Sequence, residues 1–129
     1  MNRLTLAVAL ASLALGFPAA AAAQSSVAVD ADLAKRGQKV WQNTGCMICH
    51  SIGKGKQAGP DLLGVHERRE WDWLVRFLKN TEQMLANDPI AMALLEEYKY
   101  TKMPQVRLVD SDIQAVLHYI ARETAEARD

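Results

Sequence analysis

The only two cysteines of this chain stand three residues apart, and a histidine follows the second directly, in the segment GCMICHS at residues 45–51. If Cys46, Cys49 and His50 lie on one helical turn, positions i, i+3 and i+4 share a face, so two thiols and one imidazole point the same way. A disulfide between residues this close would form a very small loop, which restricts the unfolded chain little. The segment therefore indicates a site with a chemical role rather than a structural crosslink.

The spacing C-x-x-C-H is the signature of covalent haem c attachment. The thiols of Cys46 and Cys49 would add to the two vinyl groups of the haem, and His50 would bind the iron. Other interpretations fit less well. A thioredoxin-like redox pair requires a βαβ context, which the sequence does not indicate, a structural zinc site usually requires four ligands in paired motifs, and a simple disulfide leaves His50 unexplained. We therefore expect one covalent haem c, with its iron, as the cofactor.

Residues 1–23 have the three parts of a secretory signal peptide. Arg3 supplies a positive charge, residues 4–17 are apolar, and the alanines that end at Ala23 supply the small residues that a signal peptidase requires. We expect cleavage after Ala23 and export to the periplasm of a Gram-negative bacterium.

An uncleaved membrane anchor is the alternative for this segment. Residues 4–23 carry no charge and are about as long as a membrane-spanning helix, but Pro18 interrupts them and alanine fills their second part. We favour cleavage, which would leave no membrane segment. Residues 24–29 then form a flexible N-terminus and residues 30–129 a single domain.

The charge of the chain is balanced, with 15 basic and 15 acidic side chains. No basic stripe indicates nucleic acid as a partner. A small exported domain often relies on disulfides or on a bound prosthetic group for its stability. We expect a monomer of this kind.

Helical periodicity dominates the chain, and we find no convincing strand, so we expect an all-α fold of four to five short helices wrapped around the haem. The first helix begins near Asp30, a good N-cap. Residues 70–80 form a second helix, and Asp88 with Pro89 begins another, which ends near Tyr98. Residues 111–114 match a capping box and predict the start of the last helix.

The second axial ligand of the iron separates electron transfer from small-molecule chemistry. We expect this ligand to be Met103, because it lies in a loop before the last helix and Pro104 stiffens the chain directly after it. Met47 lies inside the attachment turn and cannot reach the opposite face of a haem. Core packing or a surface position is the simpler role of the other candidates, which are Met84, Met92, His66 and His118.

With these features the sequence resembles the small, soluble class I cytochromes c, which carry one haem. The resemblance extends from the first helix through CMICH and KMP to the last helix. It implies that the N- and C-terminal helices cross tightly, with Gly37 and Trp41 on the first and Tyr119 on the last at the crossing. The sequence differs from the family in the segment between the 70–80 helix and Met103, which is longer than the shortest members of the family require.

By the same resemblance, Gly59 and Pro60 belong to a loop below the haem, and the Pro60 carbonyl would accept the Nδ1–H of His50. Such a bond fixes the imidazole and tunes the iron. The resemblance also offers aromatic residues for packing on the haem or binding its propionates, although core packing is the simpler role of each: Trp71, Trp73 and Tyr98.

The resemblance implies a periplasmic one-electron carrier rather than an enzyme, with His50 and Met103 bound to the iron in both oxidation states. Its partners would be redox proteins that dock weakly at the haem edge, where three lysines could meet an acidic surface: Lys54, Lys56 and Lys102. Two alternatives stay open. A labile sixth ligand would give a haem-based gas sensor or small catalyst, and a stable complex would give a cytochrome subunit of a larger respiratory or denitrification oxidoreductase.

Overall fold

The computed structural model describes residues 27–129, so the expected signal peptide, its cleavage site and residues 24–26 lie outside the described residues. The described part is built from helices and contains no strand, which confirms the all-α prediction. No helix in it is long and apolar enough to cross a membrane. The elements in chain order are α1 Ala31–Asn43, the 3₁₀ helix η1 Cys46–Ile48, α2 Val65–Arg68, α3 Trp71–Lys79, α4 Thr81–Asn87, α5 Pro89–Glu97 and α6 Asp110–Glu126.

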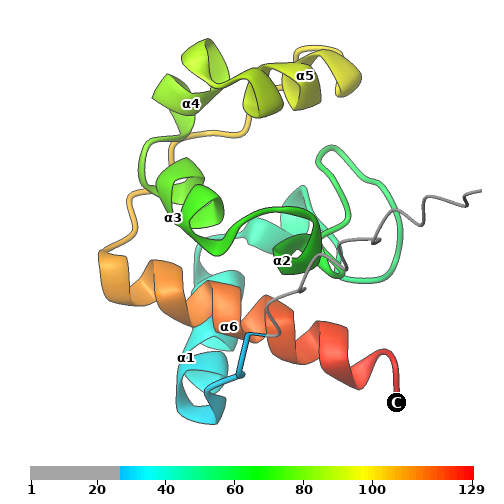
Figure 1. Ribbon diagram of the computed structural model, residues 1–129, viewed down its shortest axis with the longest axis vertical. Coiled ribbons are helices and arrows are strands. Elements are labelled where there is room, and N and C mark those ends of the chain that lie inside the picture. Colours follow the sequence, from blue (N-terminus) through cyan, green and yellow to red (C-terminus); the bar gives the residue numbers. More distant parts are fainter. Residues whose placement is uncertain (1–26) are drawn as a thin grey trace, which may run out of the picture.

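Helices α1 and α6 cross each other at one end of the molecule (Figure 1). Gly37 is buried at this crossing, where a Cβ on it would lie 1.9 Å from the carbonyl oxygen of Ala115. Only glycine permits such close approach of the two backbones. Beside the crossing, Trp41 packs on Tyr119 with ring centroids 5.9 Å apart, as the resemblance implied.

Helices α3, α4 and α5 lie on the other side of α6, with α4 and α5 packed as a pair (Figure 1). The Asp88 side chain accepts hydrogen bonds from the backbone N–H groups of Ile90 and Ala91, so it is the N-cap of α5. Asp30 caps α1 in the same way by accepting from Leu33. Both caps were predicted from the sequence.

The number of helices was underestimated, because α2 and α4 were not expected. Helix α2 has only four residues, and α4 occupies a segment that showed no clear apolar stripe. Thr81 begins α4 as a fully buried residue whose hydroxyl donates to the Phe77 carbonyl of α3. That tertiary contact joins the two helices and has no signature in the local sequence.

The expected capping box at residues 111–114 was wrong. Helix α6 begins at Asp110, so Ser111 already belongs to its first turn. The Ser111 hydroxyl accepts a hydrogen bond from Arg36 on α1, and the Gln114 carboxamide accepts one from the Trp71 indole on α3. Contacts between helices have replaced the local cap.

Candidate functional site

The turn after α1 presents the two cysteines and the histidine to one cavity. Gly45, in the left-handed region with φ of 72°, turns the chain into η1. The backbone N–H groups of Cys49 and His50 both donate to the Cys46 carbonyl, so the motif forms one tight turn. Both cysteines are free thiols. All three side chains line the same cavity, which fits the expectation of a common face.

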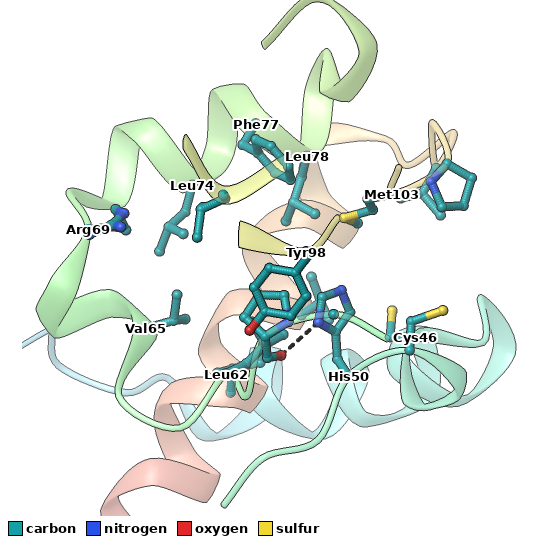
Figure 2. Close-up of a pocket in the computed structure, with 18 of the residues that line it drawn as sticks. Cys46, His50, Leu62, Val65, Arg69, Leu74, Phe77, Leu78, Tyr98 and Met103 are labelled. Atoms are coloured by element: carbon teal, nitrogen blue, oxygen red, sulfur yellow. Dashed lines mark hydrogen bonds between the residues drawn. The ribbon is translucent and has the colours of Figure 1, made fainter. Parts of the chain in front are cut away.

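The cavity has a volume of about 230 Å³ and lies between the crossed helices and the α3 to α5 side of the molecule (Figure 2). Most of its wall consists of aliphatic and aromatic side chains. Contributions come from every part of the fold, including Trp41, Leu62, Val65, Leu74, Phe77, Leu78, Leu94, Val116, Leu117 and Ile120. Such a wall suits a large apolar group with a few polar anchors.

His50 is held by the loop that follows it. Its Nδ1 lies 2.9 Å from the carbonyl oxygen of Pro60, the contact that the resemblance implied. With Nδ1–H donating to Pro60, Nε2 is the ring nitrogen left to bind a metal. Burial lowers the pKa of His50, and the bond to Pro60 opposes this only in part. The imidazole therefore stays neutral, as a metal ligand must.

Gly59 lies against the same ring. A Cβ on it would come within 2.5 Å of His50 Cε1 and 2.8 Å of His50 Nδ1. Its N–H donates to the Cys49 carbonyl over 2.8 Å. The backbone at Gly59 therefore packs directly against the imidazole, and any side chain at this position would occupy the space of the ring.

The conformation of the loop depends on Asp61. Its carboxylate accepts hydrogen bonds from the backbone N–H groups of Gly53, Gly55 and Leu63. Burial alone would raise the pKa of Asp61, but these bonds outweigh it and hold the pKa below its ordinary value. A charged carboxylate therefore organises the chain just before and after Pro60. Sequence reasoning missed this residue, whose signal was an aspartate inside a glycine-rich loop.

Met103 reaches the cavity from the side opposite His50 in the view of Figure 2. Within residues 27–129, it is the only methionine and His50 the only histidine in the cavity wall. Met47 and Met92 are about half exposed, and Met84 packs on the core cluster around Trp73. His66 packs beside Glu67, and His118 accepts a hydrogen bond from the Asp30 N–H.

The aromatic candidates divide between cavity and core. Tyr98 and Trp73 line the cavity, and the Trp73 indole donates to Asp88 over 3.2 Å. Trp71 is not part of that wall in the described structure but packs against the core cluster around Trp73, so of the two roles considered for it the structure favours core packing over contact with the haem. Its indole donates to Gln114 and its ring packs edge-on against His118. The helical register of α3 buries Trp73 and Leu74 instead.

Arg68 and Arg69 also line the cavity and were missed in the sequence, where they appear as part of a charged surface run. The Arg69 Nε is buried and has no hydrogen-bond partner among the described residues. Its guanidinium carbon lies 5.9 Å from the centre of the Trp73 ring. A buried donor without a partner is costly, so this end of the cavity suits an anionic group. Arg69 lies at the end away from Cys46 in Figure 2.

These residues fit a haem c. Two thiols lie beside an oriented imidazole, a thioether faces them across an apolar cavity, and the guanidinium of Arg69 could neutralise a carboxylate of the cofactor. No cluster of three or more histidine, cysteine or acidic residues that could hold a bare metal ion occurs in residues 27–129. Fold and site thus define a small all-α protein that carries one covalently attached haem.

The comparisons with known proteins agree with this class. The family model described as cytochrome c matches residues 34–123, and the chain therefore belongs to the cytochrome c family. It binds one haem c through Cys46 and Cys49. No curated protein matches it.

Solved structures show the same similarity. A cytochrome c from Rhodothermus marinus is 28% identical with a TM-score of 0.70, covering 77% of this chain and 83% of that one. An engineered form of it bound to a carbene intermediate is 26% identical with a TM-score of 0.66, covering 77% and 83%. The cytochrome c domain of the pp3183 protein from Pseudomonas putida is 40% identical with a TM-score of 0.64, covering 71% and 91%.

Proposed function

We propose that this protein is a periplasmic one-electron carrier, not an enzyme, whose haem iron is bound by His50 and Met103. The observation that carries the proposal is the cavity wall, in which one histidine and one methionine of the described residues face the same space as the two thiols. A histidine–methionine pair raises the reduction potential of a haem and favours electron transfer over binding of small molecules.

The protein's own residues account for the behaviour of such a carrier. Cys46 and Cys49 keep the cofactor attached. Pro60 holds His50 in one orientation. The apolar wall excludes water and disfavours the extra charge of ferric iron. When bound, the haem would supply reversible one-electron oxidation and reduction, with the same two ligands in both states.

The partners of this carrier would be redox proteins that dock near the cavity. Lys102 lines the cavity, Lys54 is exposed, and Lys56 forms an ion pair with Glu97. Lys54 is therefore available to an acidic partner, whereas Lys56 must first leave Glu97. From the signal peptide that residues 1–23 predict, we also propose that donor and acceptor are periplasmic proteins. We propose a monomer with one haem.

Carbon monoxide binding tests whether the sixth position is occupied. We expect the reduced wild-type protein to keep its absorption spectrum when carbon monoxide is added, because Met103 already occupies the site. Met103→Ala opens the position, and its spectrum should shift with carbon monoxide. Met84→Ala is the matched control, because Met84 packs in the core and not in the cavity wall.

Rapid carbon monoxide binding by the wild-type protein would contradict the carrier. It would favour a gas sensor or a small catalyst. The engineered cytochrome c from Rhodothermus marinus, whose structure contains a bound carbene intermediate, is an example of such a role in a similar protein. Purification in a stable complex with a catalytic chain would instead favour a subunit of a larger oxidoreductase.

A further inference from the structure

A side-chain contact joins two segments at the edge of the cavity. Lys56 Nζ lies 3.0 Å from Glu97 Oε1 and 4.1 Å from the centre of the Tyr98 ring. The hydrogen bond to Glu97 is the main reason that the pKa of Lys56 is raised, so the ammonium is charged at neutral pH. Tyr98 itself lines the cavity. We call Lys56, Glu97 and Tyr98 the bridge.

The bridge connects the two chain segments that bring the expected iron ligands together. Lys56 belongs to the loop that carries Pro60, whose carbonyl holds the imidazole. Glu97 and Tyr98 lie at the end of α5, and the chain continues from there to Met103. Among the described residues, Lys56 and Glu97 form the only ion pair between this loop and α5.

The turn between Tyr98 and Met103 is strained. Lys99 and Tyr100 both have positive φ angles, 52° and 61°. This region is unfavourable for residues other than glycine, asparagine and aspartate, and such a conformation persists only where its surroundings hold it. The Tyr100 N–H donates to the Leu95 carbonyl, but that bond lies within the same segment. Among the described residues, the ion pair between Lys56 and Glu97 is the only side-chain hydrogen bond or ion pair that joins residues 97–101 to another segment.

We propose that Lys56 is a positioning residue for Met103. By joining the Pro60 loop to the end of α5, it keeps the strained turn and the Met103 segment in place and limits the entry of small ligands to the sixth position. The inference rests on the proposed function, because it takes Met103 as the ligand that small molecules must displace.

The expected size of the effect follows from the exposure of the bridge. The side chains of Lys56 and Glu97 are 53% and 57% exposed, so their ion pair is weak and screened by salt. The cation–π contact with Tyr98 adds a small contribution. Loss of both contacts should speed opening of the Met103 segment about three- to tenfold.

The test is the rate at which imidazole replaces Met103 on ferric iron in the haem-loaded protein, followed by stopped-flow absorption at saturating imidazole. In this exchange an iron–sulfur bond breaks, an iron–nitrogen bond forms, and no electron moves. Lys56→Met should raise the rate about three- to tenfold. Lys56→Arg keeps the charge and both contacts, so it should restore the wild-type rate. Amide hydrogen exchange at residues 98–101 should increase in Lys56→Met alone.

Arg36 offers a matched control, because it forms a partly exposed ion pair with Asp112 over 2.6 Å that joins α1 to α6 and it does not line the cavity. Arg36→Met should leave the imidazole rate unchanged. Raising the salt concentration should speed exchange in the wild type more than in Lys56→Met. A wild-type rate in Lys56→Met, or an equal acceleration in Arg36→Met, would overturn the proposal.

The two proposals fail in different ways. A ferric spectrum without methionine ligation would overturn the ligand assignment, and the positioning role of Lys56 with it. A spectrum with methionine ligation, together with unchanged imidazole rates and hydrogen exchange in Lys56→Met, would overturn the positioning role alone.

Discussion

At the scale of single residues, the orientation of His50 depends on the absence of a side chain at Gly59. A Cβ there would lie 2.5 Å from Cε1 of the ring. The ring cannot turn away without losing its 2.9 Å contact with Pro60. That contact would make the imidazole a more basic ligand, so with His50 as the proposed ligand the glycine would act on the iron through the imidazole and the Pro60 carbonyl.

We therefore expect Gly59→Ala to destabilise the protein by about 1–3 kcal/mol, the usual cost of overpacking. We also expect a higher reduction potential, because a less basic imidazole stabilises ferric iron less. Urea unfolding and a redox titration measure the two effects. Pro60→Ala keeps the carbonyl and is the control for the potential. An unchanged potential in Gly59→Ala would show that the hydrogen bond does not depend on the glycine.

The residue scale also shows what the sequence could predict of the site. Cys46, Cys49 and His50 form a pattern within five residues, so their common function is visible locally. Arg69 could not be found this way, because its place in the cavity wall depends on how the segment between α2 and α3 packs in the folded molecule. Nor could the sequence separate Trp71, which lies outside the cavity wall, from Trp73, which lines it. The position of Trp71 on an apolar stripe did not show which neighbour it would meet.

At the scale of elements, the crossing of α1 and α6 depends on Gly37. In an isolated helix, alanine would be better than glycine by about 1 kcal/mol. Here a Cβ would lie 1.9 Å from the Ala115 carbonyl oxygen and 2.8 Å from the Tyr119 Cβ. The backbone cannot yield without separating the helices, so the clash outweighs the gain in helix propensity.

Gly37→Ala should therefore lower the free energy of unfolding by about 3 kcal/mol, at the upper end of overpacking costs. Thermal unfolding of the haem-loaded protein measures this change. Lys39→Ala is the matched control on the exposed side of α1 and should have little effect. Equal stability of Gly37→Ala and the wild type would contradict the tight crossing.

Helix α5 depends on its cap. The pKa of Asp88 is lowered, chiefly by the hydrogen bond from the Ala91 N–H, with further contributions from Trp73 and Ile90. Because its pKa is lower in the folded state, Asp88 stabilises the fold above its unfolded pKa of about 4, and this contribution is lost as pH falls through the folded value.

Asp88→Asn keeps an acceptor but not the charge. We expect this variant to be somewhat less stable than the wild type at about pH 6, with a smaller difference at about pH 3, below the unfolded pKa. Urea unfolding at both pH values measures this difference in the free energy of unfolding. The effect of pH on the other acidic groups is the same in both proteins and cancels in the comparison. A gap that stays constant with pH would mean that the charge of Asp88 does not contribute.

Among the elements, caps with local chemistry were predictable and tertiary ones were not. Asp30 and Asp88 each bind backbone N–H groups two or three residues ahead, so the local sequence contains both donor and acceptor. Ser111 and Gln114 have the same local pattern, but Arg36 and Trp71 compete for their oxygens from other helices. The all-α class could be predicted from helical periodicity alone. The number of helices and the residues at their ends depended on packing between helices.

At the scale of the whole molecule, the fold holds two segments on either side of an apolar cavity. The Gln105 side chain donates to the carbonyls of Leu78 and Lys79 at the end of α3, which ties the Met103 segment to that helix. On the other side, the Pro60 loop holds His50. The long connection through α4 and α5 supplies part of the cavity wall, including Leu94 and Tyr98. The segment between α3 and Met103, which is longer than in the shortest members of the family, therefore has a structural role.

The ferric absorption spectrum of the purified protein tests the central claim, ligation by His50 and Met103, most directly. We predict the weak long-wavelength charge-transfer band of methionine-bound ferric haem in the wild type and in Met92→Ala, whose side chain is half exposed. The band should be absent in Met103→Ala. A wild-type spectrum without the band, or a band that survives in Met103→Ala, would contradict the ligand pair and with it the account of the protein as a simple electron carrier.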